Sequence, residues 1–418
     1  MKKRILIIGA GAVGAVVANK CAQNSQAFSD VCIASHHIEK CHSILDNIKN
    51  KNNINECYIY TAQVDACDTQ DVISLIVDSG SDIVINVCTA FVNMSILDAC
   101  IETGAAYIDT AVHEDYDVMN APYPWYANFE WKKRQHCKEK GVTAILGAGF
   151  DPGVVNAYCA YAQKKEFDVI DSIDIIDVNA GDHERFFSTN FDPEINLREI
   201  IEDAGCLEDG QWRTYKHHSR AMEYDFPEVG LHKLYLMGHD EEHSLSINIA
   251  GVKSVRFWMG FSDHYINCLN VFKNVGLLNH QKIQIPGGQN VVPLHLLKAC
   301  LPEPASLAPN YIGKTCIGIL IKGTYNKKPK EAFIYNICDH QEAYHDVSSQ
   351  AIAFTAGVPP VAAALLIARG DWDIKTMVNV EELEPEPFLS ILNEMGLSTC
   401  IHEAPIDDEL SLPRTLCA

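Results

Sequence analysis

The sequence predicts an α/β protein in which a doubly wound parallel sheet is followed by a second α+β domain with a mixed, largely antiparallel sheet. Up to about residue 150, short apolar strands alternate with helical stretches, which is typical of a parallel sheet covered by helices on both faces. After about residue 170, apolar and polar residues alternate within several runs, which indicates half-buried strands. A chain of 418 residues is long enough for two hydrophobic cores.

The first predicted strand, residues 4–8, runs directly into a complete GxGxxG turn and then into a helix-forming stretch. The first glycine permits a tight turn, the second lets the backbone approach a pyrophosphate, and the third allows close packing of helix on strand. Free N–H groups at the start of the helix favour the anion. This context predicts a Rossmann-type dinucleotide site. Its predicted contacts are Gly9, Gly11, Ala12, Val13 and Gly14.

The tip of the second strand, residues 31–34, decides which dinucleotide is expected. An acidic residue there would bind the ribose 2′-OH of NAD, and no carboxylate is present. Ser35, His36 and Lys40 instead offer hydrogen bonds and positive charge to a 2′-phosphate. The sequence therefore favours NADP(H) over NAD. The alternative is that the two histidines are exposed loop residues and Ser35 alone tolerates either cofactor.

Further strands are expected at residues 58–66, 83–87, 107–109 and 142–146, with helices between them. In such a sheet, ligand contacts gather where strands end. The cofactor contacts predicted on this basis are Asp65, Ala66, Asn86, Thr89, Gly149 and Phe150. The last strand ends in Gly149-Phe150-Asp151-Pro152-Gly153. Asp151 before Pro152 would serve as a helix N-cap with proline at N1, and that structural role alone would explain it.

The second half of the chain is predicted to form strands at 173–178, 245–249 and 255–259, and a strand pair at 313–323 and 331–337. Residues 351–354 and 361–368 are expected to be helical and to pack back on the first domain, and 381–387 to form an exposed connector. The expected organisation is an NADP-binding domain at 1–150, a substrate-binding and dimerisation domain at 151–345, and a C-terminal helical segment at 346–418.

Composition excludes several classes of partner. A formal charge of −22 argues against binding to nucleic acid or to an anionic membrane surface, and it would attract cationic small molecules. Sixteen cysteines are scattered without a disulfide-framework spacing, so reduced thiols and a cytoplasmic location are expected. No stretch is expected to reach the apolar length that spans a bilayer. The His239 to His243 run lacks the order of HExxH, and no metal site is predicted.

Five motifs together resemble the saccharopine dehydrogenase-like reductases, and within that family the carboxynorspermidine-forming branch. They are residues 9–14, 34–35, 149–156, 254–261 and 353–359, of which the GFDPG segment is the most discriminating. The resemblance implies an NADPH-dependent reductive coupling in which a diamine condenses with aspartate β-semialdehyde and a hydride reduces the imine. It also implies a homodimer formed through the second domain. Family members usually carry a basic residue after Ser35, so His36 is a departure.

The same resemblance places Asp151 beside the nicotinamide, where burial would raise its pKa enough for acid–base work. Asn179, Asp182 and Glu184 follow the first strand of the second domain, and a carboxylate there would hold the distal ammonium. Arg185 or Arg256 would clamp the α-carboxylate, and Trp258 would wall a channel for methylenes. The alternative is that the polar residues form a solvated loop and that Trp258 belongs to an ordinary hydrophobic core.

Two other functions remain open at this point. The chain would also fit a saccharopine dehydrogenase proper, which joins glutamate with aminoadipate semialdehyde, or a homospermidine-forming relative. A triacid-like adduct demands several cationic clamps, and this acidic chain has few clustered arginines, which favours a diamine. A non-catalytic NADP-binding redox sensor would keep the glycine turn but would need no polar substrate pocket.

Overall fold

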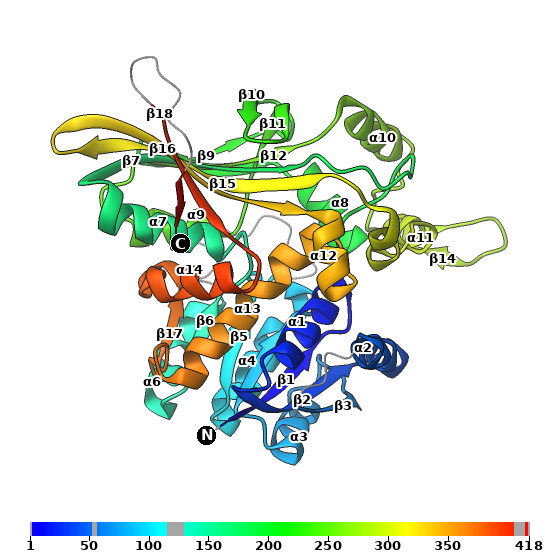
Figure 1. Ribbon diagram of the computed structural model, residues 1–418. Coiled ribbons are helices and arrows are strands. Elements are labelled where there is room, and N and C mark those ends of the chain that lie inside the picture. Colours follow the sequence, from blue (N-terminus) through cyan, green and yellow to red (C-terminus); the bar gives the residue numbers. More distant parts are fainter. Residues whose placement is uncertain (1, 52–56, 115–128, 405–413, 417–418) are drawn as a thin grey trace.

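Seven parallel strands form the first sheet of the computed structural model, which describes residues 2–51, 57–114, 129–404 and 414–416. The strand order is β17-β6-β5-β4-β1-β2-β3, so the chain reverses direction across the sheet between β1 and β4. The bounds are β1 Lys3–Ile8, β2 Phe28–Ser35, β3 Tyr58–Gln63, β4 Ile83–Asn86, β5 Ala106–Asp109, β6 Ala144–Leu146 and β17 Met377–Asn379. The predicted doubly wound parallel sheet is confirmed (Figure 1).

Alternate residues of β1 enter two different cores, because successive side chains of a strand point to opposite faces. Ile5 and Ile7 pack with one set of helices and Leu6 and Ile8 with the other. The first set is α1 Ala12–Gln23, α2 Ile38–Asn50 and α13 Ala351–Arg369, and the second is α3 Thr69–Ser79, α4 Asn93–Thr103 and α6 Arg134–Lys140. Both faces of the sheet are therefore covered, as the sequence pattern predicts.

The second sheet has ten strands and lies above the first in Figure 1. Its main order is β10-β11-β12-β7-β15-β16-β18-β19, and β8 pairs with β12 and β9. Only the β12–β7 pair is parallel, which confirms the mixed, largely antiparallel sheet. The bounds are β7 Val169–Asn179, β8 Ala204–Glu208, β9 Gln211–Tyr215, β10 Ala221–Phe226, β11 Gly230–Met237, β12 Ser254–Gly260, β15 Lys314–Tyr325, β16 Lys328–Asp339, β18 Thr399–Ala404 and β19 Arg414–Leu416.

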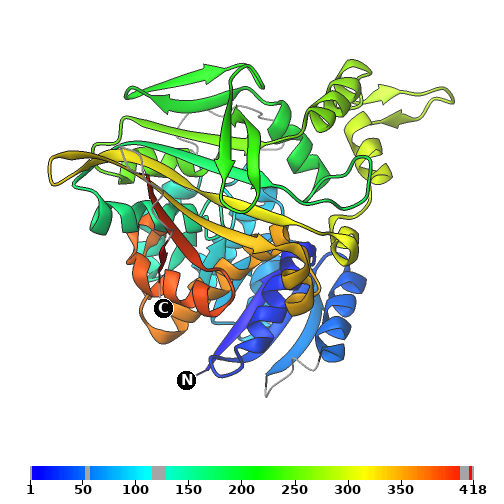
Figure 2. The ribbon, with the colours of Figure 1, turned by 45° about the horizontal axis from the view of Figure 1, so that its top comes forward.

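The remaining helices lie between the sheets or at the rim of the second sheet (Figures 1 and 2). They are α7 Val154–Tyr161, α8 Pro193–Ile201, α9 Glu241–Asn248, α10 Asp263–Asn274, α11 Pro293–Cys300, α12 His340–Val347 and α14 Pro385–Glu394. Short helical turns occur at Ala90–Val92, Glu130–Lys133, Ala162–Glu166, Pro304–Asn310 and Val380–Glu382, and a small hairpin is made of β13 Ile283–Gln284 and β14 Asn290–Val291.

Helix α13 is the central element between the two sheets, and it contacts α1 along its length. Of the helices described here, it alone is long and apolar enough to cross a membrane, and 83% of its most apolar window is buried inside the protein. The expectation that no stretch reaches that length is therefore wrong for α13. Its all-round apolar surface is explained by packing, because a helix enclosed on every side has no face that needs polar residues.

Two local predictions are wrong. Residues 245–249, expected as a strand, belong largely to helix α9, because the alternating letters Leu-Ser-Ile-Asn-Ile sit at the end of a helix that begins at Glu241. Residues 381–387, expected as an exposed connector, form a helical turn and the start of α14. Glu381 is buried there, where its carboxylate accepts from the Asn156 and Asn248 amides at 2.9 Å each.

The C-terminal quarter of the chain contributes to both sheets. After α13, strand β17 adds to the edge of the first sheet beside β6. Strand β18 then pairs with β16 of the second sheet, and β19 pairs with β18. The segment boundaries at residues 150 and 345 stay a prediction.

Candidate active site

A cavity of about 1320 Å³ lies between the two sheets, at the carboxyl ends of β1, β2 and β4. This is the edge where the chain reverses direction across the first sheet, and open α/β sheets bind ligands at such a point. The glycine turn forms one end of the cavity, and helix α8 with the inner face of the second sheet forms the other. The first sheet thus supplies the turn and the second sheet supplies the opposite wall.

The glycine turn is held by two close backbone approaches. A Cβ atom on Gly9, whose φ is +120°, would lie 2.6 Å from the Val87 carbonyl oxygen, and one on Gly14 would lie 2.0 Å from the Gly9 oxygen. A side chain on Gly9 would therefore clash with the backbone that follows β4. A side chain on Gly14 would clash with the backbone of the turn between β1 and α1. Gly14 itself does not line the cavity, whereas Gly9, Gly11, Ala12 and Val13 do.

Helix α1 opens onto the cavity without a cap. Its first turn has no acidic residue, and Gly11 at the N-cap position provides no side-chain hydrogen bond. The orphan N–H groups of this twelve-residue helix therefore face the cavity beside the open space over Gly11. These features fit the pyrophosphate of a dinucleotide.

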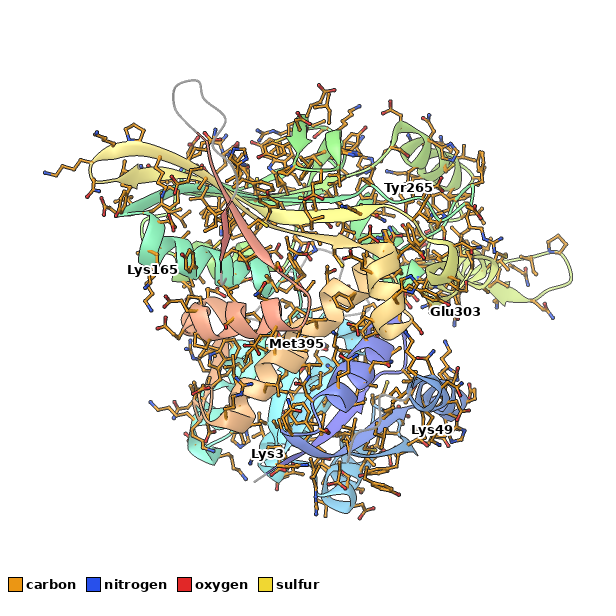
Figure 3. The ribbon with its side chains drawn as sticks, in the orientation of Figure 1. Lys3, Lys49, Lys165, Tyr265, Glu303 and Met395 are labelled. Atoms are coloured by element: carbon orange, nitrogen blue, oxygen red, sulfur yellow. The ribbon has the colours of Figure 1, made fainter. Side chains whose placement is uncertain are left out.

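Most of the predicted cofactor contacts lie on the cavity wall. They are Ser35, His36, Lys40, Asp65, Ala66 and Thr89, in addition to the turn. Ser35 Oγ accepts from the His37 N–H at 3.2 Å, and Lys40 Nζ lies 3.4 Å from Glu303 Oε1. Figure 3 shows Glu303 on the segment beyond α11, above the helix that carries Lys49. This segment therefore covers the tip of β2 from the side of the second sheet.

Besides Gly14, three predicted cofactor contacts lie away from the cavity. Asn86 is buried and its side-chain Nδ2 donates to Asn93 Oδ1 at 2.7 Å, while its Oδ1 accepts from the Cys88 N–H at 3.1 Å. Phe150 is buried with its ring 6.3 Å from that of Tyr158. A Cβ on Gly149 would lie 3.1 Å from the carbonyl oxygens of Thr110 and Pro152. All three support the strand ends and do not face the ligand space.

Asp151 lines the cavity, and its interpretation as a helix cap is wrong. The N-cap of α7 is Gly153, whose N–H donates to Asn156 Oδ1 at 2.8 Å. In the described structure no hydrogen bond is made by the Asp151 carboxyl group. Burial raises its pKa well above the ordinary value, and the nearby charges of Asp177, Glu241 and Glu199 raise it further, while His239 lowers it. Asp151 is therefore a carboxyl group open to a ligand and ready to hold a proton.

His239 is fixed beside Asp151 between two carboxylates. Its Nε2 lies 3.0 Å from Glu199 Oε1 and its Nδ1 lies 2.5 Å from Glu241 Oε2. The ring stacks on Phe257 at 4.0 Å between centroids. Burial lowers the pKa of His239, but Glu241 and Glu199 outweigh burial and leave it well above the ordinary value. The imidazole is therefore held as a cation at neutral pH.

One face of helix α8 forms the wall opposite the glycine turn. Ile195, Arg198, Glu199 and the C-cap residue Glu202 line the cavity, and their spacing of three, four and seven residues places them on the same side of the helix. Burial and the charge of Glu114 raise the pKa of Glu202 to about 7. Arg198 is buried, with its guanidinium 5.2 Å from the Phe91 ring and 4.0 Å from Glu114.

Acidic side chains dominate the cavity. The described lining includes Asp65, Glu114, Asp151, Asp177, Asp192, Glu199, Glu202, Asp203, Asp240 and Glu303, against Lys40, Arg198, Lys298 and the cationic His239. Lys298 is already paired with Asp192 at 2.9 Å and Glu194 at 3.3 Å. A cavity lined mainly by acidic side chains attracts a cationic ligand and repels a polyanionic one.

None of the predicted substrate contacts lies on the cavity wall. Asn179 is used by the fold, because it donates to the Tyr311 hydroxyl at 2.5 Å and its oxygen accepts from the Gly181 N–H at 3.0 Å. Asp182 Oδ1 accepts from the Glu184 N–H at 2.8 Å within an exposed turn, and Arg185 is also exposed. The polar residues that follow β7 therefore form a surface loop and do not contact the cavity.

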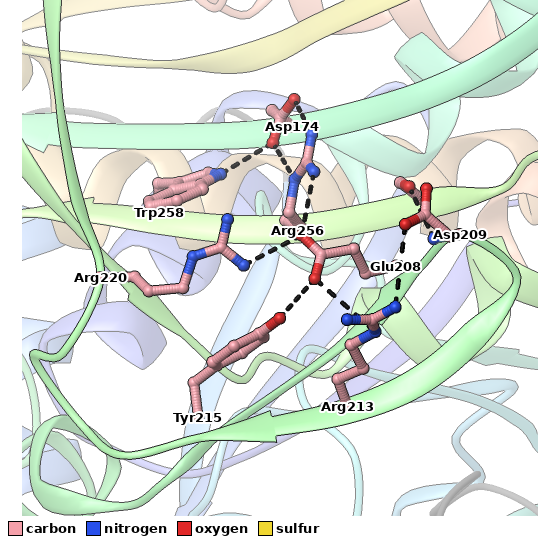
Figure 4. A network of polar contacts seen from close by, with 9 residues as sticks. Asp174, Glu208, Asp209, Arg213, Tyr215, Arg220, Arg256 and Trp258 are labelled. Atoms are coloured by element: carbon pink, nitrogen blue, oxygen red, sulfur yellow. Dashed lines mark hydrogen bonds and ion pairs between the residues drawn. The ribbon is translucent and has the colours of Figure 1, made fainter.

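Arg256 and Trp258 point to the outer face of the second sheet, as Figure 4 shows. Arg256 binds Asp174 through Nε at 2.6 Å and NH2 at 2.8 Å, and Trp258 Nε1 donates to the same carboxylate at 2.8 Å. Glu208 extends this network to Arg256 at 3.7 Å, to Arg220 at 2.9 Å and to Tyr215. The predicted carboxylate clamp and methylene wall are therefore wrong for these two residues, because strand parity places them away from the cavity.

Sequence reasoning missed Asp177, Glu199 and Arg198, although each carried a signal. Asp177 shares the odd-numbered face of β7 with the buried Ile173 and Ile175. An acidic residue continuing a buried apolar face is unusual enough to single out. For Arg198 and Glu199 the signal was Asp192-Pro193, which is typical of the start of a helix. Once the start of the helix is known, its period places the later residues on its faces.

The raised pKa values predict a stability that falls as pH rises above about 6.5. Burial raises the pKa of Asp177 to about 7 and that of Asp240 to about 8, so the folded state holds protons that the unfolded chain releases near pH 4. Glu202 and His239 act in the same direction. Because the folded state binds more protons in this range, the free energy of unfolding decreases with pH, by ~1.4 kcal/mol per pH unit for each proton of difference.

Buried neutral histidines have the opposite effect on the free energy of unfolding at lower pH. They therefore set the lower limit of the pH range in which stability falls with rising pH. Burial lowers the pKa of His218 and His340 to about 4 and that of His243 to about 3, so the unfolded chain binds these protons first below pH 6.5. Thermal unfolding of the ligand-free protein at pH 6.5, 7.5 and 8.5 checks the prediction. A melting temperature that rises across that range would contradict it.

No group of three or more His, Cys, Asp or Glu side chains is arranged to hold a metal ion within the described part of the chain. The cysteines that the structure describes are free thiols.

Family models match nearly the whole chain. The saccharopine dehydrogenase NADP binding domain matches residues 5–145, and the saccharopine dehydrogenase C-terminal domain matches residues 149–397. The chain belongs to the saccharopine dehydrogenase family. Membership makes the protein an oxidoreductase with a nicotinamide cofactor, and the uncapped α1 and the open turn described above fit that cofactor.

Curated relatives in this family cover almost the same length. Carboxynorspermidine synthases from Vibrio alginolyticus and Vibrio cholerae are each 45% identical over 96% of this chain and 97% of their own. A carboxyaminopropylagmatine dehydrogenase from Synechocystis is 43% identical over 94% of this chain and 96% of its own. The solved apo saccharopine dehydrogenase (L-Glu forming) from Saccharomyces cerevisiae, at 11% identity and a TM-score of 0.68, covers 96% of this chain and 100% of its own and shares the fold.

Proposed function

We propose that this family member catalyses the NADPH-dependent reductive condensation of aspartate β-semialdehyde with a diamine, 1,3-diaminopropane or putrescine, in polyamine biosynthesis. The products are carboxynorspermidine and carboxyspermidine. The observation that carries the proposal is the acidic wall of the cavity opposite the glycine turn, which suits an amine cation. Two relatives at 45% identity are named for carboxynorspermidine, which supports the same reaction here.

The amine would enter as an ammonium ion between helix α8 and the second sheet. Glu199 and Glu202 on one side and Asp177 on the other present carboxylates to that space. A diamine carries a second ammonium, which the same wall would hold in place through charge-assisted hydrogen bonds.

The semialdehyde brings an α-carboxylate, for which the wall offers a buried arginine. Arg198 projects from the same face of α8 as Glu199 and lines the cavity. A guanidinium binds a carboxylate through two parallel hydrogen bonds, which fixes the aldehyde end of the substrate as well as its charge. This assignment replaces Arg185 and Arg256, which lie outside the cavity.

Asp151 would move the proton that imine formation requires. The attacking amine must lose a proton, and the carbonyl oxygen must gain one before it leaves as water. Asp151 has a raised pKa and no hydrogen-bond partner in the described structure, so it can hold such a proton close to neutral pH. The bound nicotinamide cofactor then supplies the hydride that reduces the imine.

We extend the proposal to NADPH as the preferred cofactor, on the basis of Ser35, His36 and Lys40 at the tip of β2. Replacing Ser35 with Asp puts a carboxylate where a 2′-phosphate would lie. The S35D variant is expected to lower kcat/KM for NADPH at least about tenfold relative to NADH, because like charges in contact repel. Steady-state kinetics with both cofactors measures the ratio, and an unchanged ratio would place the 2′-phosphate elsewhere.

The proposal includes a cytoplasmic homodimer that acts on small molecules and binds neither nucleic acid nor membrane. The net charge of −22 supports the last part. Light scattering coupled to size-exclusion chromatography tests the dimer, and a monomer mass would overturn it.

A second candidate amine is agmatine, because the Synechocystis relative at 43% identity is named for an agmatine adduct. Glutamate is disfavoured, because an adduct rich in carboxylates would face an acidic wall with few free cations. The deciding assay follows NADPH absorbance with aspartate β-semialdehyde plus 1,3-diaminopropane, putrescine or agmatine, and in parallel with aminoadipate semialdehyde plus glutamate. Oxidation only with an amine establishes the proposal. Oxidation only with glutamate refutes it, and no oxidation in any well points to a redox sensor.

A further inference from the structure

We infer that Asp177 is a second catalytic carboxylate, which binds the reacting ammonium and takes its proton while Asp151 serves the carbonyl oxygen. The inference rests on the proposed function and assigns a separate task to each of two carboxyl groups. Asp177 belongs to none of the family motifs, and its position in the fold is what brings it to the cavity.

Strand register places Asp177 in the floor of the cavity. It pairs with Met259 of β12 and Ile317 of β15, and all three residues line the cavity side by side. Ile173 and Ile175, on the same face of β7, are fully buried in the core. Along this face of β7, the apolar residues therefore lie in the core and Asp177 lies at the cavity.

The Asp177 carboxyl group makes no hydrogen bond or ion pair within the described structure, and the same is true of Asp151. Both side chains are partly accessible from the cavity, and the protein engages neither carboxyl group, so both are available to a ligand that enters this space. By contrast, Asp174 on the opposite face of β7 is fully used by Arg256 and Trp258. The difference between Asp174 and Asp177 separates a structural carboxylate from one held ready for a substrate.

The two open carboxyl groups line the same cavity, and the charge of one raises the pKa of the other. After burial, the charge of Asp177 is the largest cause that raises the pKa of Asp151. Burial raises the pKa of Asp177 itself to about 7, with His239 lowering it and Glu199 and Glu241 raising it. Like charges at short range do not both ionise readily, so the pair starts with the proton on Asp151 and with Asp177 ionised.

The proton steps balance with this starting state. Asp177 accepts one proton from the ammonium, and the freed lone pair forms the C–N bond while Asp151 gives its proton to the carbonyl oxygen. The nitrogen of the resulting carbinolamine returns a proton to Asp151. The nitrogen lone pair then expels the hydroxyl, which takes the proton held on Asp177 and leaves as water. Both carboxyls are back in their starting states when the imine is ready for reduction.

His239 is a positioning residue in this arrangement. Both of its ring nitrogens are occupied by Glu199 and Glu241, and Phe257 fixes the plane of the ring. It therefore supplies a fixed positive charge beside the two aspartates and does not itself exchange a proton with the substrate. That charge opposes the burial that raises the pKa of Asp177 to about 7, so a part of the Asp177 carboxyl groups is ionised at neutral pH.

The test compares Asp177→Asn with Asp171→Asn, the same substitution on the same strand. Asp171 lies outside the cavity in an exposed pair with Lys253, so its replacement controls for the loss of one charge on β7. The D177N variant is expected to lower kcat about 10²- to 10⁴-fold. D171N is expected to keep the wild-type value, and D177E to recover part of it. An unchanged kcat in D177N overturns the inference.

A binding measurement separates this inference from the proposed function. Calorimetric titration of 1,3-diaminopropane, putrescine and agmatine into the NADP⁺ complex needs no turnover. D177N is expected to weaken amine binding about 10- to 100-fold, as loss of a charge-assisted hydrogen bond does, while NADP⁺ affinity stays unchanged. A wild type that binds the amines without consuming NADPH refutes the proposed reaction. Even then, intact amine binding by D177N overturns the role of Asp177, and its loss supports that role.

Discussion

The Asp151→Asn variant is expected to lose about 10²- to 10⁴-fold in kcat with aspartate β-semialdehyde and the preferred amine, at nearly unchanged stability. Asn has the same shape as Asp but cannot carry the proton. The fold does not depend on the carboxylate, because the N-cap of α7 is made by Gly153 and Asn156 and Asp151 has no hydrogen-bond partner in the described structure. The loss should therefore appear in turnover and not in folding.

Three measurements on D151N separate catalysis from structure. Thermal unfolding should match wild type or show a slightly higher melting temperature at pH 8, because a neutral amide avoids the cost of ionising a buried carboxyl group. Binding of NADPH should stay the same. The kcat should fall at every pH. A wild-type kcat in D151N would show that Asp151 is not catalytic. A strongly lowered melting temperature would show that its role is structural.

The Arg256→Gln variant is expected to lower the free energy of unfolding by about 3 kcal/mol, with little change in the KM of either substrate. Arg256 neutralises Asp174, which is 8% exposed and also accepts a hydrogen bond from Trp258 Nε1. Removing the guanidinium leaves that carboxylate buried with a single hydrogen bond, which is costly because its desolvation is no longer offset. Chemical denaturation followed by Trp fluorescence measures the change.

The double variant Asp174→Asn with Arg256→Gln provides the control for this prediction. It removes both charges, so it should recover part of the stability lost in R256Q, and the coupling between the two sites follows from the cycle. A large rise in the KM for the semialdehyde, with unchanged stability, would contradict the structural role. It would instead return Arg256 to the carboxylate-binding site that the sequence alone suggested.

The glycine turn and the strand–helix alternation were predictable because they depend on local geometry. The spacing of Gly9, Gly11 and Gly14 after an apolar strand allows few other structures, and the cavity lies where that turn ends. The paired strands β15 and β16 followed from alternation in the same way. Residues 245–249 misled because a short alternating run is also compatible with the end of a helix.

By itself, the sequence determined the fold class and the nucleotide-binding turn, because strand–helix alternation and the spacing of the glycines are local patterns. The resemblance to the family added the expectation that Asp151 lies at the site. Only the tertiary structure decided which charged side chains face the cavity. Asp174 and Asp177 lie three residues apart on one strand, yet one binds Arg256 on the outer face and the other lines the cavity. The physical reason is that the side chains of a strand point alternately to its two faces, and pairing with β12 and β15 decides which face meets the cavity. Whether each carboxylate finds a hydrogen-bond partner then depends on residues from distant parts of the chain.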